Sequence, residues 1–359
     1  MYRRRILADT FKYTRVLMRS NHSTANVYPF HGNKNPFMMC LPEICAVHKK
    51  YYYKFDERQN ASQKRLFLIS SSFLFGLFGS DDEKDHTEEL KMTLKRSILL
   101  MQKGEFKKAE QMLHVALRQA QTLQHYDGIT YVYDVMANLA HSMNDLPKAE
   151  KLFLAVLQRL ISKGVPQDDM AVIHVSLKIA NIYERMGNIE KSEHGYSFCL
   201  QNLENHLVKD SENEDVLQLL CLAQQWYGAM LFSQSRYNEA LKHFTEAYDI
   251  SIKINKEESE ETVLLLNDLG ALSSMLEDND KAIQYLLRAI EIGKSIPDMD
   301  DFGAVHINLG NVFISNGMYE QAKKSCTEGM HLAKAKDNNG SVMEAEKCLD
   351  TLKRLNALV

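Results

Sequence analysis

The sequence predicts an all-α fold, a stack of about six helix pairs closed by a further helix at the C-terminus. Two spacings carry this prediction. A small residue is followed by a large one four positions later and a small one seven later, in six sets: Ala109/Leu113/Ala116, Ala149/Phe153/Val156, Ser192/Tyr196/Cys199, Ala240/Phe244/Ala247, Ala282/Leu286/Ala289 and Ala322/Cys326/Gly329. A further small residue lies twelve positions before each set, at Ser97, Ala137, Ala180, Gly228, Gly270 and Gly310.

Residues 1–60 have the composition of a mitochondrial transit segment that is largely disordered. Basic residues crowd the first twenty positions with apolar residues between them, which on a helix gives a cationic amphipathic face. Residues 20–60 show no sustained period and contain Pro29, Pro36 and Pro42. An exposed basic arm is the alternative interpretation.

Residues 61–80 contain the chargeless run LFLISSSFLFGLFG, from Leu66 to Gly79. As a helix this run is roughly 21 Å long, which is shorter than the ~30 Å hydrocarbon core of a bilayer. Three interpretations remain open: an inner-membrane sorting signal that is cut or retained, a short permanent anchor, or a buried helix of the domain.

Residues 86–336 hold the six repeats. Small side chains let two helix axes approach closely, and the large residue fills the space beside them. We expect Gly104, Gly187, Gly317 and Asn144 to adopt the left-handed conformation in the turn inside a pair. The positions expected to pack the repeats are Ala109, Ala137, Ala149, Ala180, Gly228, Ala240, Gly270, Ala282, Gly310 and Ala322.

Residues 341–358 are predicted to form the capping helix that an open stack requires. Ser341 and Glu344 match a capping box at its start. One apolar stripe follows, at Ala345, Cys348, Leu349, Leu352 and Leu355.

Charge and cysteine content limit the function further. Residues 1–80 carry a net charge of +9 and the remainder carries −13, and an acidic body argues against nucleic acid as a partner. The four cysteines within helical patterns, Cys199, Cys221, Cys326 and Cys348, are expected to be buried free thiols. Catalytic, cofactor and metal motifs are missing from the sequence, so we expect no enzyme and no cofactor.

The repeat pattern resembles the tetratricopeptide repeat family, whose second helices carry the same small–large–small spacing. The family unit has 34 residues, and the units of this chain have 40 or more. The resemblance implies a right-handed superhelix in which the first helix of each pair lines a concave groove.

A candidate peptide-binding groove follows from this resemblance. Asn138, Asn181 and Asn311 each come directly after the small residue of a first helix, and an amide side chain can bond the backbone of an extended peptide. A solvated or locally bonded Asn is the alternative. By the same register the groove is expected to include Tyr131, Asp134, His141, His174, Arg185, Phe232 and Asn267.

Three stretches resemble a mitochondrial branch of the family: ITYVYDVMANLA (129–140), SLKIANIYERMGN (176–188) and GYSFCL (195–200). This resemblance implies a non-enzymatic factor at the mitochondrial inner membrane. It would support the assembly and maintenance of respiratory complex III (cytochrome bc1) and help to clear N-terminal fragments of the Rieske iron–sulfur subunit. Its partners would be complex III subunits and the Rieske protein or its fragments.

Two other functions remain open at this point. A cytosolic peptide-binding adaptor or co-chaperone also uses tetratricopeptide units but needs no import signal. A protease with a Cys and a His is disfavoured, because Cys199 and Cys326 occupy positions expected to pack the repeats.

Overall fold

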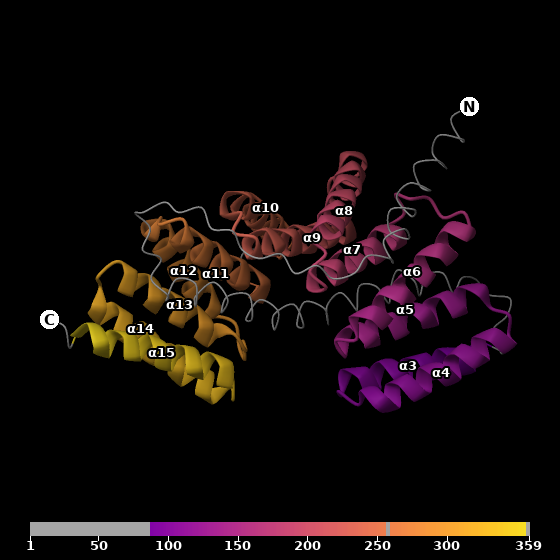
Figure 1. Cartoon of the computed structure of the whole chain (residues 1–359), viewed down its shortest axis with the longest axis horizontal. Coiled ribbons are helices and arrows are strands. Elements are labelled where there is room, and N and C mark those ends of the chain that lie inside the picture. Colours follow the sequence, from indigo (N-terminus) through magenta and orange to yellow (C-terminus); the bar gives the residue numbers. More distant parts are fainter. Residues whose placement is uncertain (1–86, 256–258, 357–359) are drawn as a thin grey trace, which may run out of the picture. The chain divides into compact units, whose positions relative to one another are not determined.

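The computed structural model describes residues 87–255 and 259–356, which fold into α-helices without a β-strand (Figure 1). The helices are α3 (Glu88–Gln102), α4 (Phe106–Thr122), α5 (Tyr126–Ser142), α6 (Leu146–Ser162), α7 (Met170–Arg185), α8 (Ile189–Lys209), α9 (Glu214–Ser233), α10 (Tyr237–Asn255), α11 (Glu260–Met275), α12 (Asn279–Gly293), α13 (Phe302–Ser315), α14 (Tyr319–Ala335) and α15 (Asn339–Asn356). The described residues divide into two compact units, and the boundary along the chain lies within α8, between Cys199 and Leu200.

Consecutive helices pack in pairs within each unit. The first unit holds α3–α4, α5–α6, α7 and the beginning of α8, and the second holds α9–α10, α11–α12, α13–α14 and α15. The hydroxyl of Ser192 on α8 donates to the carbonyl oxygen of Ala180 on α7 at 2.9 Å, which joins the pair α7–α8. Six pairs therefore precede a final helix, and the predicted all-α repeat stack is confirmed.

First and second helices differ in how much of their surface is buried. The second helix α10 buries a narrow stripe, Ala240, Phe244, Ala247 and Ser251. The first helix α7 is buried at every position from Ala171 to Glu184. Each large apolar side chain buried in this way contributes about 1.5–3 kcal/mol to the stability of the fold.

The ten expected packing positions are all buried. Gly270 on α11 lies so close to α12 that a Cβ atom there would be 2.6 Å from Cγ of Leu286. Gly310 on α13 faces Sγ of Cys326 on α14 in the same way. These glycines are needed because a side chain at either position would occupy space that the second helix already fills.

The turns inside the pairs use left-handed residues. Gly104, Gly187 and Gly317 have φ of +75°, +76° and +72°, and Asn144 has φ of +60°, as the sequence predicts. In the pairs α9–α10 and α11–α12 this conformation is adopted by Ser235 (φ +61°) and Glu277 (φ +63°). Neither residue type favours it, so the sequence does not indicate these two positions.

Two expectations need correction. Cys199 and Cys221 are buried free thiols as expected, but Cys326 and Cys348 form a disulfide, because α15 packs on α14. The capping helix begins at Asn339, before the expected start at Ser341. Its cap is Asn338, whose Oδ1 accepts from the backbone N–H of Ser341 at 3.0 Å.

None of the helices within residues 87–255 and 259–356 combines the length and the apolar character needed to cross a bilayer. The expected transit segment (1–60) and the expected sorting or anchor segment (61–80) lie outside the described residues.

Candidate functional site

A buried ion pair links the first helices of the second and third repeats. Lys178 on α7 and Asp134 on α5 are 2% and 1% exposed, and Lys178 Nζ lies 3.5 Å from Asp134 Oδ1. Asn138 Nδ2 donates to Oδ2 and to the backbone carbonyl oxygen of Asp134, at 3.0 and 2.7 Å. Burial lowers the pKa of Lys178 while the carboxylate of Asp134 opposes this effect. Lys178 Nζ also lies 5.1 Å from the ring centroid of Phe153 on α6.

His174 lies one turn before Lys178 on α7 and is buried. Its Nε2 atom has no hydrogen-bond partner among the described residues. Burial, with the nearby Lys178, lowers the pKa of His174 well below its ordinary value, so the ring is neutral at physiological pH.

A second link between α5 and α7 involves His141 and Arg185. Arg185 Nη1 lies 3.1 Å from His141 Nε2, and its Nη2 donates to Asn144 Oδ1 at 2.9 Å. A guanidinium can only donate, so Nε2 of His141 is the acceptor. Burial, together with Arg185 and Lys178, lowers the pKa of His141 to about 3.

The polar face of α7 also holds α8. The hydroxyl of Tyr196 on α8 donates to Glu184 Oε2 at 2.6 Å, and both residues are buried. Burial, with the carboxylate of Glu184, raises the pKa of Tyr196 well above its ordinary value. Together, these contacts make α5, α7 and the beginning of α8 one polar interior.

The asparagines do not form one exposed row. Asn138 and Asn181 are buried within the first unit, and Asn138 is bonded within its own helix, as the alternative interpretation allowed. Asn311 is exposed on α13 of the second unit. The reason is local, because the side chain of Asn138 lies one helical turn after the buried Asp134 and binds it.

The second unit brings together a set of amide side chains, Asn267, Asn308 and Asn311, which we name the amide stripe. Asn308 Nδ2 on α13 donates to Asn267 Oδ1 on α11 at 2.7 Å. Asn267 is 1% exposed, and its Nδ2 atom has no hydrogen-bond partner among the described residues. A buried amide N–H without a hydrogen-bond partner is costly, because the donor has lost its bond to water.

The remaining expected groove residues are Tyr131 on α5 and Phe232 on α9, and both are buried. Three residues were missed: Lys178, Glu184 and Asn308. Lys178 interrupts an apolar segment, MAVIHVSLKIANIY, that otherwise contains no Asp, Glu, Lys or Arg, and this pattern could have indicated a buried charge. Asn308 lies three positions before Asn311, and this spacing places the two side chains next to each other on the surface of the helix.

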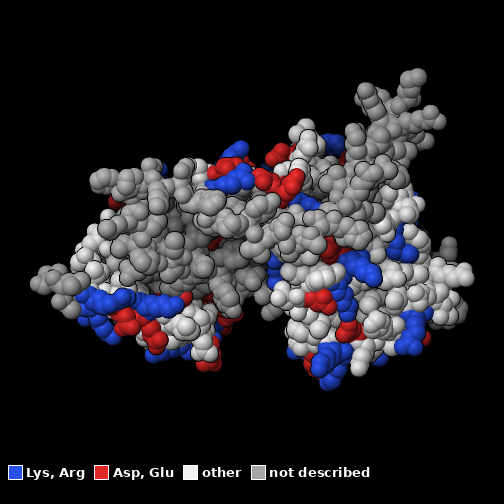
Figure 2. Space-filling view, viewed as in Figure 1, with Lys and Arg blue, Asp and Glu red and all other residues white. Residues whose placement is uncertain are grey.

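The described residues contain no group of three or more His, Cys, Asp or Glu side chains placed to hold a metal ion. Burial raises the pKa of the Cys199 thiol, so this cysteine is protonated and is a poor nucleophile. On the face viewed in Figure 2, acidic and basic side chains are interspersed over the described surface.

The fold and the site define a helical repeat scaffold of the tetratricopeptide class, whose buried polar side chains hold its own helices together. A family model for the tetratricopeptide repeat matches residues 215–295. Two solved structures share the fold: the apo form of RapI (TM-score 0.52, 17% identical, covering 63% of this chain and 83% of that one), and the STAND protein PH0952 with a tetratricopeptide repeat sensor from Pyrococcus horikoshii (TM-score 0.53, 16% identical, covering 79% and 42%).

Sequence relatives identify the family within this class. The chain is 40% identical over 289 residues to the mitochondrial tetratricopeptide repeat protein 19 homolog of Drosophila melanogaster, covering 80% of this chain and 78% of the relative. It is 32% identical over 286 residues to the mitochondrial tetratricopeptide repeat protein 19 of Homo sapiens, covering 77% and 75%. The chain belongs to the family of mitochondrial tetratricopeptide repeat protein 19.

Proposed function

We propose that the protein is a non-enzymatic factor at the mitochondrial inner membrane that supports the assembly and maintenance of respiratory complex III. It helps to clear N-terminal fragments of the Rieske iron–sulfur subunit. The observation that carries the proposal is the 40% identity, over 80% of the chain, to a mitochondrial protein of this family. The complex III role itself rests on the resemblance of residues 129–140, 176–188 and 195–200 to the mitochondrial branch of the tetratricopeptide repeat family.

The amide stripe is the part of the scaffold that we propose captures an extended peptide segment. Asn267 supplies a buried N–H donor without a described partner, and Asn311 supplies an exposed amide on the neighbouring first helix. Amide groups bond the peptide backbone without selecting side chains, which suits the capture of processing fragments of varied sequence. Capture would hold a fragment while a protease removes it.

Removing the amide stripe should weaken this capture. Asn311→Ala combined with Asn267→Asp removes two amide donors. The variant keeps the side-chain oxygen at position 267 that accepts from Asn308. It should reduce retention of Rieske fragments about 10-fold, since each hydrogen bond contributes about 0.5–1.5 kcal/mol. The full-length variant would be expressed in mitochondria and purified by affinity, and the recovered complex III subunits and Rieske fragments would be quantified.

Asn316→Ala, at an exposed asparagine in the turn after α13, is the matched control. Asn311→Ala alone keeps the test valid if the double variant fails to fold, and it should lower retention severalfold. Retention equal to that of the control, with unchanged helicity, would reject capture by the amide stripe. If no complex III subunit co-purified with the unaltered protein, the proposed function itself would be rejected.

The proposed position beside the inner membrane is supported by the outward face of α3. Met92 and Leu99 are 46% and 50% exposed and lie two helical turns apart on one face. Lys95 and Arg96 are exposed beside them and form no ion pair within the described part of the chain. The chargeless run 66–79 precedes α3 closely in the sequence. Two apolar side chains flanked by cations suit an anionic phospholipid surface.

A photoreactive amino acid at position 99 of the full-length imported protein should therefore cross-link to phospholipid. Replacing Lys95 and Arg96 by Gln should reduce these adducts about 30-fold, since each cation near an anionic surface contributes about 1 kcal/mol. The same probe at Leu287, which is 49% exposed on α12, is the control. If the probe formed adducts with protein only, or formed equal amounts of lipid adduct at positions 99 and 287, α3 would no longer support a position beside the inner membrane.

A further inference from the structure

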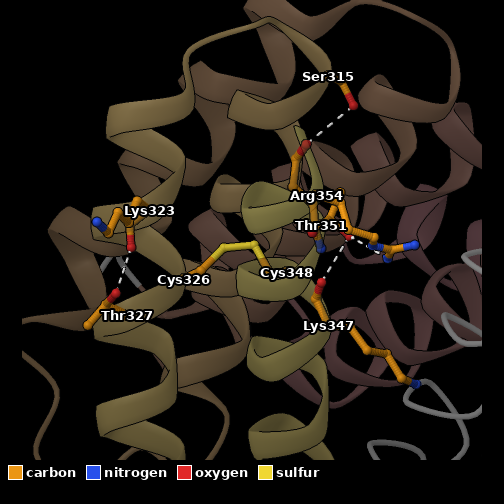
Figure 3. The surroundings of a disulfide bond; sticks show 9 residues. Ser315, Lys323, Cys326, Thr327, Lys347, Cys348, Thr351 and Arg354 are labelled. Atoms are coloured by element: carbon orange, nitrogen blue, oxygen red, sulfur yellow. Dashed lines mark hydrogen bonds between the residues drawn. A yellow bond between two sulfur atoms is a disulfide. The ribbon is translucent and has the colours of Figure 1, made fainter. Parts of the chain in front are cut away.

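One covalent link closes the end of the second unit. Cys326 on α14 and Cys348 on α15 form a disulfide with a Cα–Cα distance of 6.2 Å, across a sequence separation of 22 residues (Figure 3). Their side chains are 0% and 3% exposed. The separation of the two Cα atoms lies within the range of native disulfides.

The surrounding helices hold both cysteines in place. Gly310 on α13 leaves room for Sγ of Cys326, because a Cβ atom at this position would collide with the sulfur. Cys348 belongs to the buried stripe of α15, with Ala345 and Leu352. The pair therefore joins α15 to α14 at a point where α13 also packs.

The two other cysteines of the described residues differ from this pair. Cys199 Sγ donates to the backbone carbonyl oxygen of Ile173 at 3.5 Å, and Cys221 Sγ donates to that of Ala247 at 3.3 Å. Each is a free buried thiol inside a helix pair. They serve as internal controls for any thiol chemistry of the chain.

We propose that Cys326 and Cys348 are a reversible thiol–disulfide site that locks the capping helix α15 onto the last repeat. The oxidant is the disulfide of a thiol–disulfide exchange partner. The thiolate of one cysteine attacks that disulfide and releases the first partner thiol. The thiolate of the other cysteine then attacks the mixed disulfide and releases the second. Two cysteine thiols are oxidised, one partner disulfide is reduced to two thiols, and the protons pass to the released thiolates.

The link matters because α15 is the last described helix, and among the described helices it packs on α13 and α14. With the disulfide closed, α15 cannot leave α14 without breaking a covalent bond. With the disulfide reduced, only non-covalent contacts hold α15, and terminal helices open more readily than internal ones. The redox state therefore controls how often the apolar surface of the last repeat is uncovered.

Differential alkylation of the full-length protein from mitochondria tests the site. The protein would be denatured in one maleimide, reduced, labelled with a second maleimide and digested with trypsin. Peptides 325–334 and 348–353, which carry Cys326 and Cys348, should acquire the second label. Cys199 and Cys221 should carry the first label. Cys326 and Cys348 carrying the first label would overturn the proposal.

Hydrogen exchange of the full-length protein tests the locking effect. Reduction should speed exchange of the α15 backbone amides about 300-fold, the effect expected for opening a loop of this length, and should leave those of α12 unchanged. Cys348→Ser should exchange as the reduced protein does and should not respond to reductant. Exchange of α15 that is the same in both redox states would show that the disulfide does not lock the helix.

Discussion

Lys178→Met should destabilise the first unit by about 3–5 kcal/mol, because it leaves the carboxylate of Asp134 buried without its cation. Urea unfolding of the full-length protein, followed by circular dichroism and by hydrogen exchange of α5 and α7, measures the loss.

The double variant Asp134→Leu with Lys178→Met distinguishes the cost of an unpaired buried charge from the contribution of the ion pair itself. Replacing both members of a buried ion pair by apolar side chains is often neutral or stabilising. We therefore expect the double variant to be more stable than Lys178→Met alone. A single variant that loses less than about 1 kcal/mol would show that the pair is not desolvated as its burial indicates.

Gly329→Leu should lower the free energy of unfolding by about 3 kcal/mol, because Gly329 lies where the backbones of α14 and α13 pack closely together. A Cβ atom at Gly329 would lie 2.6 Å from Cγ1 of Ile307 and 2.8 Å from the carbonyl oxygen of Gly303. A backbone oxygen cannot rotate away, so the two helices must separate to admit any side chain.

Thermal unfolding, combined with hydrogen exchange of α13 and α14, measures this effect. Thr327→Leu, at an exposed position on the same helix, is the matched control and should change stability by about 0.5 kcal/mol or less. Equal losses in the two variants would contradict close contact between the helices at Gly329.

Much of the fold could be predicted because it depends on local spacing. Small residues such as Ala240 and Ala282 recur at fixed distances from large ones, and their burial follows from helix geometry alone. The same holds for Gly104 and Gly187, since a residue without Cβ adopts the left-handed conformation at little cost. Ser235 and Glu277 adopt it against their preference, because the packing of their helix pairs fixes the turn.

The candidate site was harder to predict because it depends on neighbours distant in the sequence. Asn138, Asn181 and Asn311 occupy the same repeat position, yet only Asn311 is exposed. The apolar surroundings of Lys178 in the sequence indicate a buried charge. Its partner Asp134 lies in the preceding repeat, so the sequence does not show which residue pairs with it.

By itself, the sequence determined that this chain folds into helix pairs, where the pairs pack and which family the chain resembles, because these properties depend on side-chain size at fixed helical intervals. Only the tertiary structure decided that Asp134 meets Lys178, that Asn308 meets Asn267 and that Cys326 meets Cys348. Each of these contacts joins different helices, so it depends on which faces pack together in space, and the spacing along the chain does not specify that.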